Sequence, residues 1–149
     1  MILVDSSVWV DFFNGRTTPQ TLKLDALLGE EPLLVGDLIL CEVLQGARSE
    51  AHATKLESAL RKFDIVPMLD SDIAVASAKH YRVLRAKGIT VRKTIDLLIG
   101  TCCILRGYRL LHADRDFDPL QEHLGLRVVE TPWAVHDRGA RPAARRPSR

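Results

Sequence analysis

Short apolar runs of strand length alternate along the chain with longer segments whose apolar residues recur at helical spacing. Gly, Pro, Ser, Thr and Asp mark many of the boundaries between these segments. The strands expected from this pattern cover residues 1–4, 33–35, 65–66, 109–112 and 126–129. The expected helices cover residues 8–13, 19–28, 37–47, 50–62, 71–87 and 95–106, followed by a short one that ends at residue 123.

Several helix ends carry capping signals. Ser6 or Ser7 is expected to cap the first helix, Asp37 the third and Thr94 the one that begins at residue 95, while Gly88 closes the helix before it. Strands that alternate with helices in this way are joined by right-handed crossovers. The sequence therefore predicts an α/β fold, with a parallel sheet covered by helices on both faces.

Length and composition favour one folded domain, because 149 residues with 46% hydrophobic content suffice for a single core. The net charge of +2 is distributed unevenly. Five arginines fall near the C-terminus without an acidic residue among them: Arg138, Arg141, Arg145, Arg146 and Arg149. The rest of the chain is left at about −3. We expect a domain over residues 1–135 and a basic, disordered tail over residues 136–149, which is either passive or in contact with RNA.

Other function classes find little support. No apolar run approaches the roughly 20 residues that span a bilayer, and the first residues lack the basic segment of a secretory signal, so a cytoplasmic protein is expected. The three cysteines, with Cys102 and Cys103 adjacent, lack the spacing of a zinc site and are expected to be buried thiols. The five histidines are scattered singly and are assigned to packing or to the surface.

Four acidic residues stand where strands end or where the surroundings are apolar. Asp5 and Asp114 each follow an apolar strand, and the carboxyl ends of neighbouring parallel strands meet at one edge of a sheet. Asp96 falls in the first turn of an apolar helix, where the helix dipole favours its charged form. Glu42 is a lone charge in an apolar helical stretch, and it needs a partner or a metal if it is buried.

Carboxylates that converge repel one another unless cations neutralise them, and Mg²⁺ or Mn²⁺ with oxygen ligands suits that requirement. Such ions can activate water for in-line attack on a phosphodiester and stabilise the departing oxygen. Each acid also has a structural explanation. Asp5 could cap a helix, Asp96 could pair with the helix dipole, Asp114 could open a turn and Glu42 could lie on a solvated helix edge. On the residues alone the constellation is suggestive only.

Four stretches resemble the acidic motifs of VapC-type PIN domains, in order and across nearly the whole chain to about Trp133. They are Val4–Phe13, Cys41–Gly46, Thr94–Ile99 and His112–Phe117. The resemblance implies a PIN-like three-layer α/β/α fold with a central parallel sheet of four or five strands. It also implies the toxin half of a VapBC toxin-antitoxin pair, a metal-dependent endoribonuclease that hydrolyses RNA and inhibits translation and growth.

The resemblance also implies roles for single residues. Asp5, Glu42, Asp96 and Asp114 would hold the metal, Mg²⁺ or Mn²⁺, and Asp116 would support the site. Whether Asp114 or Asp116 ligates directly is left open. Ser6 matches a small hydroxyl residue that supports the ligands by hydrogen bonding, and Ser7 competes with it for the capping role.

Partners follow from the same resemblance. Family members are commonly homodimers, restrained by a cognate VapB-type antitoxin whose C-terminal segment often places an Arg among the acids. The Arg-rich tail departs from the pattern, because it extends past the usual end of the domain. Arg92, Lys93 and Arg115 could meet RNA phosphates, and a solvated counter-charge role is equally compatible with the sequence. Trp9 and Phe12 could stack on a base, although their spacing favours packing.

Two other function classes remain. The same kind of sheet could carry a structure-specific DNA nuclease or another metal-dependent phosphohydrolase, although no Gly-rich phosphate loop is present. The chain could instead be a non-catalytic binding module, which the set of clustered carboxylates disfavours, because unused acids would only repel.

Overall fold

Four short parallel strands form the centre of the molecule. The computed structural model describes residues 1–131, and its strands are β1 (Ile2–Val4), β2 (Leu33–Gly36), β3 (Asp64–Val66) and β4 (Arg109–Leu111). Their order in the sheet is β3-β2-β1-β4. All three pairings are parallel, which confirms the predicted sheet of four or five strands.

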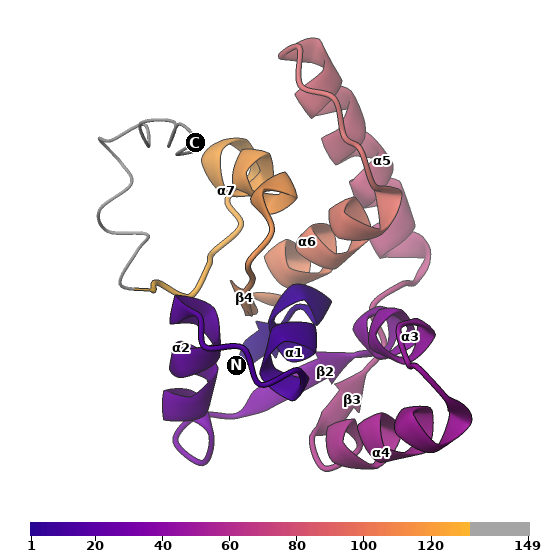
Figure 1. Cartoon of the computed structure of the whole chain (residues 1–149). Helices are drawn as coiled ribbons and strands as arrows, with labels where there is room; N and C mark the ends of the chain where they lie inside the picture. Colours follow the sequence, from indigo (N-terminus) through magenta and orange to yellow (C-terminus); the bar gives the residue numbers. More distant parts are fainter. Residues whose placement is uncertain (132–149) are drawn as a thin grey trace, which may run out of the picture.

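Helices cover both faces of this sheet (Figure 1). They are α1 (Ser6–Phe13), α2 (Pro19–Leu27), α3 (Asp37–Gln45), α4 (Glu50–Leu60), α5 (Ser71–Ala86), α6 (Thr94–Arg106) and α7 (Asp118–Leu124), with a 3₁₀ turn, η1 (Arg115–Phe117), before the last. Helices α1 to α4 contact one another as one group, and α5 to α7 as a second. Right-handed crossovers place two such groups on opposite faces when the chain reverses direction along the sheet, here between β3 and β4. The predicted three-layer α/β/α architecture is confirmed.

Because the crossover from β3 brings β4 to the free side of β1, the switch point of the sheet lies between β1 and β4. Ile2 lies opposite Leu33 of β2 on one side and Arg109 of β4 on the other. The β1–β4 ladder continues one residue beyond β1, because the backbone N–H of Asp5 donates to the carbonyl of Leu111 at 2.9 Å. The carboxyl ends of these two strands therefore meet at a topological switch point, where open α/β sheets bind ligands.

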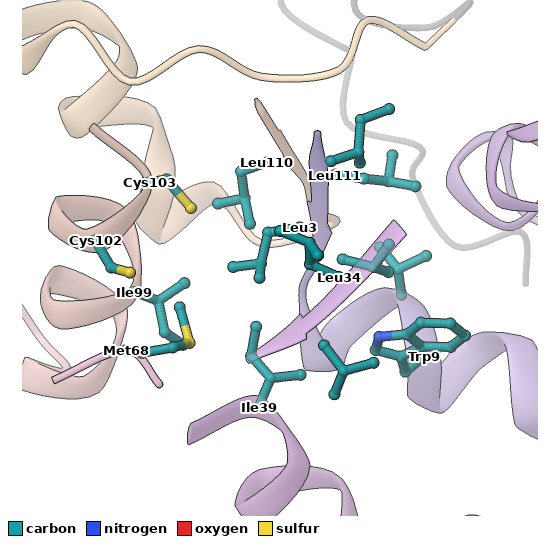
Figure 2. Close-up of a cluster of buried hydrophobic side chains, with 14 of the residues drawn as sticks. Leu3, Trp9, Leu34, Ile39, Met68, Ile99, Cys102, Cys103, Leu110 and Leu111 are labelled. Atoms are coloured by element: carbon teal, nitrogen blue, oxygen red, sulfur yellow. The ribbon is translucent and has the colours of Figure 1, made fainter. Parts of the chain in front are cut away.

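The core is built on β1, whose three residues are fully buried. Figure 2 shows Leu3 and Leu34 of the sheet between Trp9 of α1 and Ile99 of α6. Trp9 stacks on the ring of Phe13, with centroids 5.7 Å apart, so the expectation that Trp9 packs rather than meets a base is confirmed.

Helix α6 is buried along most of its length. Its Gly100 lies so close to Leu120 of α7 that a side chain at this position would overlap it. The small residue therefore lets α7 pack tightly against α6. This contact positions both helices near the carboxyl ends of β1 and β4.

Most predicted elements match the structure to within two residues, but three predicted helix caps are wrong. Asp5, rather than Ser6 or Ser7, caps α1 by accepting from the backbone N–H of Ser7. Asp37 is the first residue of α3, and Thr94 is the first residue of α6 rather than its cap.

The predicted strand over residues 126–129 is wrong. Val128 forms only an isolated bridge with Leu110 of β4. The chain turns at Gly125, which has a positive φ of 79°, and the N–H of Leu126 bonds back to the carbonyl of Leu120. The segment reaches the sheet for too short a distance to form a ladder.

Cys102 and Cys103 are buried thiols as expected, whereas Cys41 is exposed, so the burial expected for all three cysteines is wrong for Cys41. Among residues 1–131, no helix combines the length and apolarity required to cross a bilayer. The predicted domain boundary at residue 135 and the Arg-rich tail lie outside the described residues.

A substitution at Gly36 tests how tightly the sheet packs against the loop before α5. A Cβ at Gly36 would overlap the side chain of Met68, which is fully buried. We expect Gly36→Ala to lower the free energy of unfolding by about 1–3 kcal/mol, because overpacking displaces buried atoms. Urea denaturation measures this change.

Gly46→Ala is the matched control, since its Cβ would lie 3.5 Å from the carbonyl of Val43, an ordinary contact. We expect a change within about 0.5 kcal/mol for this variant. Equal losses in both variants would contradict the packing explanation.

Candidate metal centre at the carboxyl ends of β1 and β4

Asp5 occupies the first position after β1 and is 3% exposed. Its Oδ2 accepts hydrogen bonds from the backbone N–H of Ser7 at 3.1 Å and from the Ser7 hydroxyl at 2.6 Å. Within residues 1–131, its Oδ1 is buried and has no hydrogen-bond partner. A buried oxygen of this kind has lost its hydration and gained nothing in return, unless a ligand contacts it.

Ser7 ties the two central strand ends together. Its hydroxyl donates to Asp5 and accepts from the backbone N–H of Ala113, just beyond β4, at 3.1 Å. The sequence predicts only a capping role for Ser7, because nothing in its position indicates a hydrogen bond with a residue 106 positions away.

Asp114 and Asp116 lie in the segment that follows β4. Asp114 Oδ1 accepts from the backbone N–H of Asp116 at 2.9 Å, and this bond opens the 3₁₀ turn η1. The backbone N–H of Asp114 donates to Nδ1 of His112 at 3.2 Å. These bonds fix the direction of the Asp114 carboxylate.

Asp96 belongs to the first turn of α6 and is 5% exposed. One carboxylate oxygen from each of Asp96, Asp114 and Asp116 lies within 4.8 Å of the other two. We call these three residues the acidic cluster. Acidic residues that follow β4 and one in the first turn of α6 are thus brought together, as the resemblance to VapC-type PIN domains implied.

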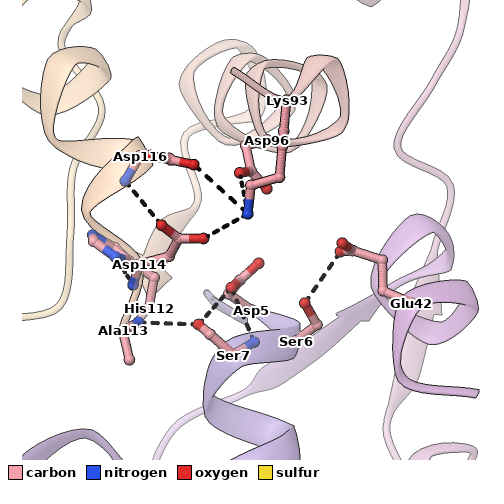
Figure 3. Close-up of polar contacts among 10 residues, drawn as sticks. All are labelled: Asp5, Ser6, Ser7, Glu42, Lys93, Asp96, His112, Ala113, Asp114 and Asp116. Carbon is pink, nitrogen blue, oxygen red and sulfur yellow. Dashed lines mark hydrogen bonds and ion pairs between the residues drawn. The ribbon is translucent and has the colours of Figure 1, made fainter. Parts of the chain in front are cut away.

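Glu42 approaches from the opposite side, on α3 (Figure 3). It is half-buried, and Ser6 donates to its Oε1 at 3.2 Å, so the hydroxyl next to Asp5 does support an acidic residue. Figure 3 shows Asp5 between Glu42 and the acidic cluster. All five predicted acids therefore face one region.

The pKa values of three acids are raised. Burial raises the pKa of Asp5, of Glu42 and of Asp96, and their neighbours' negative charges raise each further. Asp114 differs, because the hydrogen bonds from Asp116 and from Lys93 outweigh its burial and lower its pKa. Loss of hydration is the main cause of all three raised pKa values, and repulsion between the carboxylates adds to it.

Lys93 is the cation closest to these acids. Its Nζ lies 2.9 Å from Asp114 Oδ2, 3.1 Å from Asp96 Oδ2 and 3.7 Å from Asp116 Oδ2. The hydrogen bond to Asp114 is the main reason why the pKa of Lys93 is raised. The sequence indicated a basic residue near the site, but not that its ammonium would lie among the acids.

Arg92 and Arg115 are exposed and flank the same region. Both line a cavity of about 70 Å³ that Lys93, Asp96 and Asp116 also border. Positive charge therefore lies beside the acidic cluster, although neither guanidinium forms an ion pair within the described part of the chain.

The sequence predicts a packing or surface role for His112. Its ring does pack, since its centroid lies 4.9 Å from that of the Phe117 ring. Its contact with the backbone of Asp114 is new. Burial lowers the pKa of His112, so the ring is neutral near pH 7. The only sequence signal for this contact is its position two residues before Asp114.

The donor set suits a hard divalent cation. All the converging side-chain ligand atoms are carboxylate oxygens, which Mg²⁺ and Mn²⁺ prefer over nitrogen or sulfur. The buried oxygen of Asp5 that lacks a partner is the strongest sign of fit, because it faces this region (Figure 3).

Comparison with known proteins places this geometry in a family. The model of the PIN domain matches residues 2–123. Ribonuclease VapC11 of Mycobacterium tuberculosis is 37% identical over 134 residues, covering 87% of this chain and 98% of that protein. Ribonuclease VapC1 of Methanocaldococcus jannaschii is 28% identical over 130 residues and covers 87% of each chain.

Solved structures agree on the fold. VapBC2 of Rickettsia felis, bound to a DNA fragment from its promoter, matches with a TM-score of 0.69 at 18% identity, over 87% of this chain and 98% of that chain. FitAcB of Neisseria gonorrhoeae matches with a TM-score of 0.68 at 17% identity, over 89% and 99%. With its sheet order, its switch-point acids and these matches, the chain belongs to the PIN domain family.

Proposed function

We propose that this protein is a VapC-type toxin, an endoribonuclease that hydrolyses RNA phosphodiester bonds with Mg²⁺ or Mn²⁺ and thereby arrests translation and growth in the cytoplasm. The observation that carries the proposal is the convergence of five carboxylates at the switch point, one of them with a buried oxygen that lacks a partner. The 37% identity to a ribonuclease over nearly its whole length supports the reaction class.

Asp5, Asp96 and Asp114 are the residues we propose as metal ligands, with Asp116 and Glu42 completing the negative site. A divalent ion held there would lower the pKa of a bound water and offset charge that develops on the phosphate. Ser7 holds Asp5 in place and Ser6 holds Glu42. Arg92, Lys93 and Arg115 would bind the phosphates of the RNA strand beside the acids.

We also propose a cognate VapB-type antitoxin and a homodimer. The solved relatives include toxin-antitoxin complexes, VapBC2 of Rickettsia felis among them. An antitoxin Arg among these carboxylates would make charge-assisted hydrogen bonds and exclude the metal. Co-purification with the product of a neighbouring reading frame tests the first proposal, and light scattering of the purified chain tests the second.

Neutralising single acids tests the catalytic assignment. We expect Asp5→Asn and Asp96→Asn each to reduce RNA cleavage by roughly 100-fold or more, because even residues behind metal ligands contribute about 10- to 100-fold. Asp25→Asn, at an exposed position of α2, should cleave at the rate of the unmodified chain. Cleavage of a labelled RNA with Mg²⁺, with and without chelator, measures the effect.

Circular dichroism confirms that each variant is folded. Full activity in Asp5→Asn or Asp96→Asn would reject the assignment. A DNA strand of the same sequence in the same assay separates the ribonuclease from the DNA nuclease, since only cleavage restricted to RNA agrees with the proposal.

The raised pKa values predict a pH-dependent metal affinity. A metal binds the deprotonated acids, so protons compete with it as the pH falls through the raised pKa values of Asp5, Glu42 and Asp96. We expect Mg²⁺ binding to weaken from pH 7.5 toward pH 5, with release of protons. Titration calorimetry in buffers of different ionisation heat measures both quantities.

Stability should follow with a defined sign. A carboxyl whose pKa is raised by folding destabilises the folded state when it is charged. The free energy of unfolding of the metal-free chain therefore falls as the pH rises through that pKa. Millimolar Mg²⁺ should therefore raise the melting temperature more at pH 7.5 than at pH 5. An equal increase at both values would contradict this coupling.

A further inference from the structure

Lys93 lies at the N-terminal end of α6 and extends its side chain into the acidic cluster (Figure 3). Its ammonium is within 3.1 Å of an oxygen of Asp96 and of an oxygen of Asp114. The third acid, Asp116, is 3.7 Å away. One positive group thus contacts all three members of the cluster.

We infer that the Lys93 ammonium is the resident counter-cation of the acidic cluster, and that a divalent ion binds there only by displacing it. The inference rests on the proposed metal dependence and adds a competitor for the same oxygens. It makes Lys93 a residue that exchanges with the metal, so that its ammonium is free to bind an RNA phosphate only after the metal has displaced it.

Geometry makes the two cations mutually exclusive. One oxygen from each acid of the cluster lies within 4.8 Å of the other two, and Mg²⁺ binds oxygen at about 2.0–2.1 Å. An ion that contacts both Asp96 Oδ2 and Asp114 Oδ2 would stand in the space that Nζ fills. Two cations at such a distance also repel strongly.

Lys93 can leave without disturbing the fold. Its side chain is 51% exposed, whereas that of Asp96 is 7% exposed. As the N-cap of α6, it makes no capping bond through its side chain. The adjoining cavity of about 70 Å³, which Lys93 borders, offers its flexible stem a place beside Arg92 and Arg115.

The ammonium also leaves part of the site unneutralised. It makes no ion pair with Asp5 in the described residues, and the buried Oδ1 of Asp5 lacks a partner. A doubly charged ion compensates more of this negative charge than a single ammonium does.

Magnesium affinity of the full-length chain tests the competition. We expect Lys93→Met to bind Mg²⁺ at least about fivefold more tightly than the unmodified chain, because the competing charge is gone. Lys93→Arg keeps the charge and can pair bidentately with the carboxylates, so its affinity should be unchanged or weaker. Titration calorimetry gives the three dissociation constants.

Arg92→Met is the matched control, since it removes one neighbouring positive charge that makes no ion pair with the cluster among the described residues. A change below about twofold is expected, because an exposed charge is screened. A similar gain in Arg92→Met and Lys93→Met would assign the effect to net charge and overturn the inference.

The position of the lysine itself provides a second readout. Carbon NMR of the Lys93 Cε, assigned by its loss in Lys93→Met, should move toward the signals of exposed lysines as Mg²⁺ is added. A signal that stays in place while Mg²⁺ binds would overturn the inference and leave the proposed metal dependence standing.

The two proposals fail in different ways. If no variant binds Mg²⁺ at millimolar concentration and RNA cleavage persists with chelator, both the metal dependence and the exchange are wrong. If the chain binds Mg²⁺ with equal affinity before and after Lys93→Met, only the exchange is wrong.

Discussion

Pairing of β1 with a parallel strand on each side is the constraint on which the rest of this molecule depends. It buries β1 completely and sets the exit of β1 beside the exit of β4. The backbone bond from Asp5 to Leu111 and the Ser7 bridge to Ala113 then lock these two exits together. Acidic residues from distant parts of the sequence meet there, because Asp5 and Asp114 follow these two strands and the helices that carry Glu42 and Asp96 pack beside the same edge of the sheet.

The same arrangement creates an electrostatic problem that the fold solves only in part. Burial and mutual repulsion raise the pKa values of Asp5, Glu42 and Asp96. Hydrogen bonds from Ser6 and Ser7 relieve some of this, each at one carboxylate. The remaining negative charge attracts cations. The ammonium of Lys93 neutralises part of it through Asp96, Asp114 and Asp116.

The sequence predicted the fold class, the helices and the convergence of the acids, because strand ends and apolar periodicity are local signals. It failed where long-range contacts decide. No residue near Ser7 indicates its hydrogen bond with Ala113. The ion pair of Lys93 with Asp114 was missed for the same reason, because 21 positions separate them. The strand expected at residues 126–129 failed for a related reason: its apolar pattern is strand-like, but the turn at Gly125 lets only Val128 reach β4. Asp37 follows β2 as Asp5 follows β1, yet its Oδ1 accepts hydrogen bonds from the backbone N–H groups of Leu38 and Met68 instead of joining the acids.

The unpartnered oxygen of Asp5 has a consequence for which mutations this chain tolerates. Asp5→Asn would remove repulsion from Asp114 and keep an oxygen that can cap α1, so this variant would have the higher free energy of unfolding. Under the proposed metal-binding role of Asp5, activity and stability therefore favour different side chains at this position. In a lineage where RNA cleavage is no longer under selection, more stable and inactive variants at this position would accumulate.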